Sequence, residues 1–357
     1  MKRNHIIIFS MILMIIITAL IREVLITSVR YEYRVLIIAR NEVDKPVSLP
    51  EEVYIPLPPT IEGWQYIDEI RVLVNGSNVG YKLLVDNDGN FRIYPNLPLP
   101  VKIKSVMVLE YYITIRVVRN GLLFNRRPRI VVLSQIRNPQ RELLRPLGSW
   151  DWSRDDDKWC KLRYLARSLK GNNTLETVLN ISRWVLSNIE YGETEVVIPP
   201  YALYDRRRGD CADQSSFIVT LLRMLGIPSL IALGFVYDPI AKCDICEYNL
   251  RLLRRGFNLH AFVLVFIEGL GWIPLDTTAY RANPIENPLV VISDRLIIGG
   301  FVIGSNPNEY ETFRTYDQID LDIRITMKRR YDVPFFILIC EAIATLGIYV
   351  ITRRTYV

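Results

Sequence analysis

The sequence has few residues that can act as acid–base catalysts or metal ligands near neutral pH. Its 357 residues include only two histidines and five cysteines. One histidine, His5, lies in an apolar N-terminal segment, so imidazole chemistry in the rest of the chain depends on His260. A structural zinc site needs four such ligands, and this small set argues against one. We therefore expect neither a metal nor another cofactor.

The sequence also lacks a long run of charge of one sign. Its formal charge is +6, and the basic residues are spread along the whole chain. No motif typical of RNA- or DNA-binding proteins is present. Nucleic acid is therefore not an expected partner.

Two long apolar runs lie near the ends of the chain. Residues 6–27 follow Lys2 and Arg3 and are long enough for a signal peptide or a short transmembrane helix. Bulky side chains in place of a small-residue cleavage site favour an uncleaved anchor. Residues 333–351, with Glu341 as the one interior charge, predict a second transmembrane helix, the alternative being a buried helix. Basic outer flanks predict cytoplasmic ends, with the intervening chain on the exterior face of the cell membrane.

The pattern between these runs changes from strands to helices and back. Residues 28–118 contain several alternating apolar and polar segments, which predict a β-sandwich-like domain. Residues 119–154 are expected to form a connector. Helical spacing followed by strand-like runs predicts an α+β catalytic core over residues 155–281. Residues 282–332 are expected to form a C-terminal extension of strands and loops.

The stretch from Asp205 to Pro228 places a cysteine at the start of a predicted helix. Residues 212–225 contain no glycine or proline, and Gly226 follows where a left-handed cap is expected. Unpaired N–H groups and the helix dipole at such an N-terminus favour a thiolate at Cys211 over a thiol. On local sequence alone, a small buried apolar residue is the alternative.

A histidine and an aspartate occupy two neighbouring strand-like runs. His260 opens HAFVLVFI, Asp276 lies near the end of EGLGWIPLDTT, and Gly269 between the runs predicts a β-hairpin. A three-residue loop centred on Glu268 would place His260 directly opposite Asp276. The carboxylate would then orient the imidazole and leave its other nitrogen to accept the Cys211 proton. A purely structural His–Asp pair is the alternative, but it leaves the cysteine unexplained.

The order of these motifs resembles the core of the transglutaminase-like superfamily. GDC before a helix, LGIP, the run GFVYD and HAF…GWIPLDTT follow one another between Trp159 and Tyr280. The resemblance implies a papain-like α+β fold with a catalytic triad. In that triad Cys211 would be the nucleophile, His260 the base and Asp276 the orienting acid.

The resemblance also bears on two aromatic residues. The family commonly has tryptophan where this sequence has Phe262, an aromatic exchange that leaves the triad unchanged. In similar enzymes an aromatic residue upstream of the nucleophile helps to bind the oxyanion. Tyr191 is the candidate here, together with the backbone N–H of Cys211.

Two further cysteines lie in a polar insertion before His260. Cys243 and Cys246 would need two more ligands to form a metal site, and Cys160 alone cannot complete one. A small disulfide-bonded loop in an oxidising exterior is therefore predicted, with two reduced cysteines as the alternative.

The sequence thus predicts a membrane-anchored, exterior-facing cysteine enzyme acting on protein or peptide amides through an acyl-thioester. Water as acceptor would make it a peptidase or amidase, and a lysine amine would make it a transamidase. The triad is the same in both, and hydrolysis is favoured because water is available unless a site excludes it. A non-catalytic binding or envelope module that retains the fold is the alternative from another class.

Overall fold

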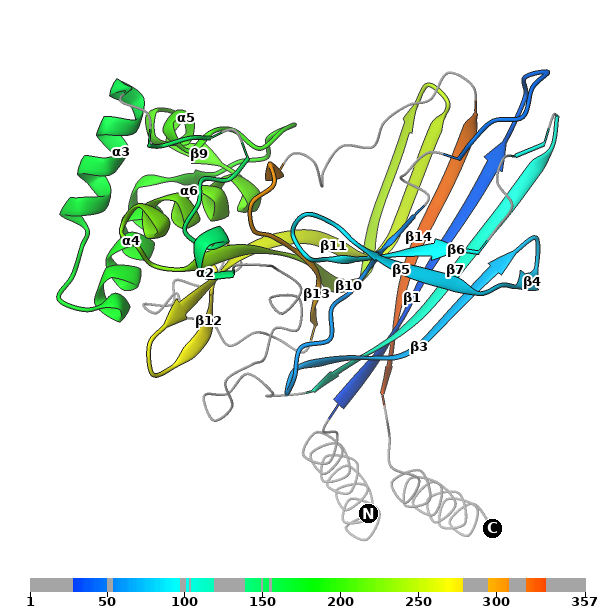
Figure 1. The fold of residues 1–357 in the computed structure, drawn as a ribbon, viewed down its shortest axis with the longest axis horizontal. Coiled ribbons are helices and arrows are strands. Elements are labelled where there is room, and N and C mark those ends of the chain that lie inside the picture. Colours follow the sequence, from blue (N-terminus) through cyan, green and yellow to red (C-terminus); the bar gives the residue numbers. More distant parts are fainter. Residues whose placement is uncertain are drawn as a thin grey trace, which may run out of the picture.

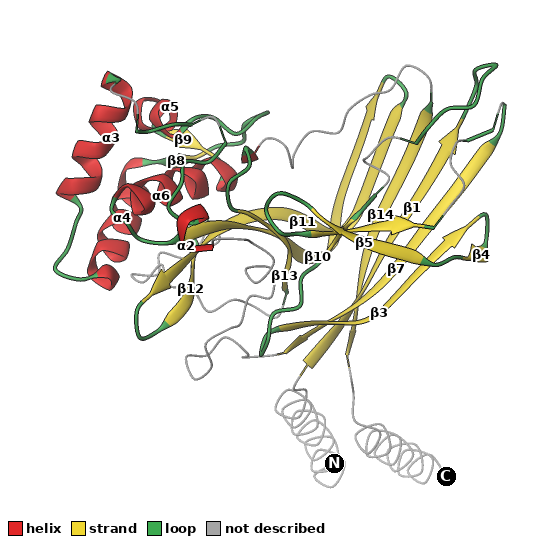
Figure 2. Cartoon of the chain, viewed as in Figure 1, coloured by secondary structure: helices red, strands yellow, loops and turns green. Residues whose placement is uncertain are grey.

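The protein is described here by a computed structural model. The structure describes residues 28–49, 54–96, 101–102, 104–118, 139–148, 150–153, 156–278, 295–307 and 319–331. A cluster of helices lies at one side of the molecule and a large β region at the other (Figures 1 and 2). The predicted membrane segments, residues 6–27 and 333–351, lie outside the described residues. None of the helices within the described ranges combines the length and apolar character needed to cross a membrane.

Most of the β region belongs to one nine-stranded sheet. Its strand order is β13-β10-β11-β14-β1-β7-β3-β4, and β12 pairs with β11 beside that path. A second sheet has the order β2-β6-β5. The strands of the two sheets are β1 (Ser28–Arg40), β2 (Pro56–Leu57), β3 (Gln65–Val74), β4 (Ser77–Asn78), β5 (Tyr81–Val85), β6 (Phe91–Pro95), β7 (Val106–Val118), β10 (Ser229–Glu247), β11 (Leu250–Ile267), β12 (Gly271–Leu275), β13 (Leu296–Val302) and β14 (Asp320–Tyr331).

The alternation of the sequence explains how the two sheets pack. In β1 the odd-numbered residues from Val29 to Ala39 are buried, and the even-numbered residues are half-buried or exposed. Side chains of a strand point alternately to its two faces, so one face of the sheet is apolar. That face packs in one core with Leu57 and Ile93 of the second sheet. The residues described between 28 and 118 are thus strands and loops in two layers, as their alternation predicts.

This β layer is completed by strands from later in the chain. β14 pairs antiparallel with the length of β1, from Val29↔Tyr331 to Arg40↔Asp320. β11 in turn pairs parallel with β14. Residues 28–118 therefore do not form a closed unit, because β10, β11 and β14 extend the sheet that begins with β1.

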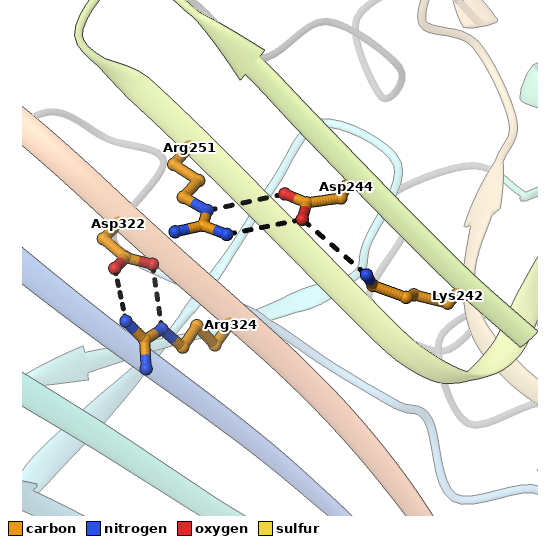
Figure 3. Close-up of polar contacts among 5 residues, drawn as sticks. All are labelled: Lys242, Asp244, Arg251, Asp322 and Arg324. Atoms are coloured by element: carbon orange, nitrogen blue, oxygen red, sulfur yellow. Dashed lines mark hydrogen bonds and ion pairs between the residues drawn. The ribbon is translucent and has the colours of Figure 1, made fainter.

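Charged side chains line the outer face where β10, β11 and β14 meet (Figure 3). Arg251, opposite Asp322 in the register, donates to Asp244 at 3.3 and 3.4 Å, and Lys242 lies 4.0 Å from the same carboxylate. Arg324 donates to Asp322 at 2.7 and 3.1 Å. The pairs at Asp244 are exposed, and pairs of this kind contribute at most about 1 kcal/mol each, whereas the Asp322 carboxylate is largely buried. Their opposite charges on neighbouring strands favour the observed register.

β10 and β11 contribute to two apolar cores at once. Successive side chains on a strand point to opposite faces, and here both faces are covered. This explains why the run HAFVLVFI is continuously apolar. The core beneath the helices receives Ile231, Ala261, Val263 and Val265, and the core of the β region receives Leu230, Ala232, Phe262 and Leu264.

The helix predicted over residues 212–225 is present as α6, shifted by one residue at each end. Asp156 caps α3 and Asn173 caps α4 through their side chains. Gly226 after α6 has φ +75°, the left-handed conformation predicted for it. The described helices are α2 (Pro139–Glu142), α3 (Asp157–Ser168), α4 (Thr174–Asn188), α5 (Pro200–Arg206) and α6 (Cys211–Met224).

Two buried amides join the β region to the edge strand β13. Gln65 accepts from the Ile298 N–H at 2.9 Å and donates to its carbonyl at 2.8 Å. Asn90 makes the same pair of bonds with Phe301, at 2.7 and 2.8 Å. These amides satisfy backbone groups as a neighbouring strand would. They hold β13, and with it β10, in a fixed position relative to the β region.

Candidate active site

Cys211 is the first residue of α6, as predicted, and its side chain is half-buried. Asp210 caps the helix by accepting from the N–H groups of Ala212 at 2.9 Å and Asp213 at 3.0 Å. The Asp213 carboxylate in turn accepts from the Asp210 N–H at 3.0 Å, which completes a capping box. The start of α6, where Cys211 lies, is therefore fixed by two reciprocal carboxylates.

Asp213 also fastens a neighbouring loop to this helix. Its fully buried carboxylate accepts from the Ile198 N–H at 2.8 Å and from the Thr194 hydroxyl at 2.9 Å. Burial raises the pKa of Asp213, although these hydrogen bonds act in the opposite direction. The sequence interpretation missed this residue. The spacing Asp-x-x-Asp just before an apolar helix was the available signal.

His260 and Asp276 lie in direct contact. His260 Nε2 and Asp276 Oδ2 are 2.6 Å apart, and both side chains are largely buried. The second oxygen, Oδ1, accepts from the N–H and the hydroxyl of Thr278, at 2.9 and 3.0 Å. The carboxylate is thus held from one side while it orients the imidazole from the other.

The hairpin register that was predicted to bring these residues together is wrong by two positions. The observed pairs run from Ile267↔Gly271 to Val263↔Leu275, and the turn is centred on Gly269, with φ +82°. Continued by one step, this register would set Phe262 opposite Asp276. His260 lies two residues before Phe262, on the same side of β11, and their rings are stacked 6.2 Å apart. The contact therefore forms diagonally across the hairpin.

The charges around His260 favour its protonated form. Burial alone lowers its pKa, but the hydrogen bonds and negative charges of Asp276 and Cys211 outweigh burial and raise the pKa to about 10. Because Nε2 is engaged by Asp276, Nδ1 is the ring nitrogen that remains for the Cys211 sulfur. The structure thus brings together all three residues of the predicted triad.

Tyr191 lies close in the fold to the segment that leads into α6. It belongs to β8 (Glu190–Tyr191), which pairs in parallel with β9 (Arg208–Gly209), and its partner is Gly209. Gly209 precedes Cys211 by two residues. The Tyr191 side chain is 42 % exposed. This placement is compatible with the predicted oxyanion role, which stays a prediction.

The predicted disulfide between Cys243 and Cys246 is wrong, since both thiols are free. The polar insertion is an extended part of β10, in which Cys243 pairs with Arg254 and Cys246 with Arg251. Three residues along a strand span ~10 Å and point to opposite faces. A disulfide requires Cα atoms roughly 4.4–6.8 Å apart. Among the described residues, no three His, Cys, Asp or Glu side chains are grouped to hold a metal ion.

A thiol at a helix N-terminus, beside an imidazole held by a carboxylate, is the arrangement used in nucleophilic acyl transfer by cysteine. Residues 163–277 match the family model of the transglutaminase-like superfamily, and this segment is a transglutaminase-like domain. A search among curated proteins gave no match.

Several solved structures are similar to this chain. A "Putative Cysteine Protease" from Cytophaga hutchinsonii is 16 % identical, with a TM-score of 0.48, and 86 % of this chain and 92 % of that chain are covered. The periplasmic domain of TgpA from Pseudomonas aeruginosa is 16 % identical, with a TM-score of 0.31 and coverage of 70 % and 91 %. Red sea bream transglutaminase is 12 % identical, with a TM-score of 0.27 and coverage of 72 % and 48 %.

Proposed function

We propose that this protein is an enzyme that forms an acyl-thioester at Cys211 from a protein or peptide amide. The observation that carries the proposal is the geometry of the site. The thiol lies at the start of α6, and it is hydrogen-bonded to an imidazole whose Nε2 lies 2.6 Å from Asp276. A module that only binds a partner has no need of all three groups in this arrangement.

In the proposed reaction the Cys211 sulfur, its proton held on His260, attacks the carbonyl carbon of the amide. The negative charge on the carbonyl oxygen is stabilised by the Cys211 N–H and by Tyr191. The C–N bond then breaks, the imidazolium gives its proton to the leaving amine, and the acyl group remains on sulfur. Water completes hydrolysis, or a lysine amine forms a new amide, with His260 accepting the proton in either case.

The test is to detect the acyl group on Cys211 by mass spectrometry after incubation with glutamine-containing peptides. A fluorescent primary amine in the same reaction separates the two outcomes, because transamidation incorporates it and hydrolysis releases a free acid. We expect an adduct in the wild-type protein and none in Cys211→Ala. Identical product formation by both proteins would refute the proposal and favour a non-catalytic module.

We also propose that residues 6–27 and 333–351 anchor the protein in a cell membrane, with the described residues on the exterior face. The ends of two neighbouring strands support this proposal. Val29 near the start of β1 pairs with Tyr331 at the end of β14. Two membrane helices that continue from these strands would therefore enter the bilayer side by side. The tip of the β10–β11 hairpin, at Leu250 beside Leu321, lies ~33 Å along β14 from that end.

Membrane anchoring predicts how the full chain behaves on extraction. The protein should stay with the membrane in alkaline carbonate and be released by detergent, because two apolar helices hold it in the bilayer. Protease added to intact cells should cut the β10–β11 hairpin, and the same treatment should spare a cytoplasmic marker protein. Release by carbonate alone would contradict the anchors, and a protected hairpin would contradict the exterior orientation.

A further inference from the structure

A buried amide connects the two sides of the candidate site. Gln214 lies on α6, three residues after the nucleophile, and is fully buried. Its Nε2 donates to the carbonyl of Gly209 at 3.0 Å. Its Oε1 accepts from the Thr277 hydroxyl at 3.0 Å. Thr277 is also buried and directly follows Asp276. One side chain thus links the end of β9, just before Cys211, with the segment that carries the carboxylate.

We infer that Gln214 and Thr277 are positioning residues that set the distance between the nucleophile helix and the His260–Asp276 pair. The inference rests on the proposed function, because this distance matters only if a proton passes between Cys211 and His260. The thiol belongs to α6, the imidazole to β11 and the carboxylate to the segment just after β12, so no hydrogen bond within one helix or hairpin sets the distance from the thiol to the other two. Apolar packing between these elements is not directional, whereas a buried hydrogen bond fixes both distance and angle.

The segment after β12 shows how the link acts on the carboxylate. Thr278 donates to Asp276 Oδ1 from its N–H and its hydroxyl, and Thr277 between them is tied to α6. The orientation of Asp276 is therefore coupled to the position of the nucleophile helix. Without the Thr277 hydroxyl, the Asp276 carboxylate keeps its hydrogen bonds to Thr278 but is no longer connected to α6 through Gln214. We then expect Asp276 to support the imidazolium of His260 less well.

The test uses Thr277→Val, which replaces the hydroxyl by a methyl group at nearly constant volume, and Thr277→Ser, which keeps the hydroxyl. For Thr277→Val we expect kcat/KM to fall about tenfold, mostly in kcat, as for the loss of one buried hydrogen bond. We also expect the alkaline limb of the pH profile, which reports the pKa of His260, to move to lower pH. Thr277→Ser should keep the wild-type kcat/KM and the wild-type position of the alkaline limb. If Thr277→Val does not fold, Thr277→Ala removes the same hydroxyl.

The same comparison can be made without a substrate, through the rate at which iodoacetamide alkylates Cys211 across pH in the full chain. A variant that melts at lower temperature but keeps the wild-type pH profile would overturn the inference, because the link would then be only structural. A Thr277→Ser protein that behaves like Thr277→Val would overturn it too. A shifted alkylation profile in a protein that transfers no acyl group would support the positioning role while refuting the proposed function.

Discussion

Replacing His260 with alanine is expected to reduce turnover by about 10²–10⁴-fold, the range for loss of a general acid–base catalyst. In the proposed reaction the imidazole holds the proton of the Cys211 thiol and later delivers it to the leaving amine. The pKa of His260 is raised to about 10, since the hydrogen bonds and charges of Asp276 and Cys211 outweigh burial. The positive charge beside the sulfur therefore persists at neutral pH. Alkylation of Cys211 by iodoacetamide at pH 7 should accordingly slow by at least about tenfold in the variant.

The same raised pKa predicts a dependence of stability on pH. Protonated His260 contributes stability that is fully present below its ordinary pKa of 6.5 and is lost as pH rises through about 10. Urea denaturation should therefore give a free energy of unfolding that declines between pH 6.5 and 10. The decline should be smaller in His260→Ala. Activity should show an alkaline limb in the upper part of this window, because the leaving amine needs the imidazolium proton.

The protein contains its own control for the alkylation experiment. Cys246 is an exposed, free thiol on the distal part of β10, away from the triad. Its alkylation rate should be the same in the wild-type and His260→Ala proteins, so the ratio of the two modified peptides isolates the effect at Cys211. Equal ratios in both proteins would mean that the thiol is not activated by His260. That result would favour the non-catalytic module.

The site was predictable from sequence where its signals are local. A helix without glycine or proline, ended by Gly226, fixes where Cys211 lies, because caps and propensity act over a few residues. The neighbouring strands of HAFVLVFI and GWIPL bring His260 and Asp276 close, because the observed register differs from the expected one by an even number of residues. The placement of the three residues therefore followed from short-range patterns and from their order along the chain, whereas their catalytic roles stay a prediction.

The register of that hairpin was not predictable, for a reason visible in its turn. Gly269 and Gly271 both have positive φ, and the sequence Glu-Gly-Leu-Gly supports more than one placement of the loop. Packing of β11 and β12 against the core decides between them, and such packing is not encoded locally. The contact was still foreseen correctly, because a shift of two residues keeps His260 on the same face.

The pairing of strands that lie far apart in the sequence was also not predictable. Nothing local indicates that β14 inserts between β11 and β1, since strands of similar composition are interchangeable until they pack. The insertion with Cys243 and Cys246 is polar, which suggested a loop. In the structure it is a strand, because β11 pairs with it as its hairpin partner and is itself held on its other edge by β14.

Asp276→Asn is expected to leave the fold intact and to reduce turnover by about 10²–10⁴-fold. The amide oxygen of asparagine can still accept from the N–H and hydroxyl of Thr278, so the turn after β12 keeps its hydrogen bonds. The amide nitrogen, however, can donate to His260 Nε2, which places the ring proton on Nδ1. In that tautomer Nδ1 cannot accept the proton of the Cys211 thiol.

Asp276→Asn also removes a negative charge. The effect of this charge on the pKa of His260 can be measured separately from the effect on the orientation of the ring. Without the carboxylate the pKa of His260 should fall from about 10, and the alkaline limb of the rate profile should move to lower pH. Asp244→Asn is the matched control, because the same chemical change then falls on an exposed ion pair of the distal hairpin. It should alter neither turnover nor the limb. Wild-type turnover in Asp276→Asn would exclude Asp276 from the mechanism. If turnover is lost while the alkaline limb stays at its wild-type pH, Asp276 orients the imidazole ring and has no electrostatic role.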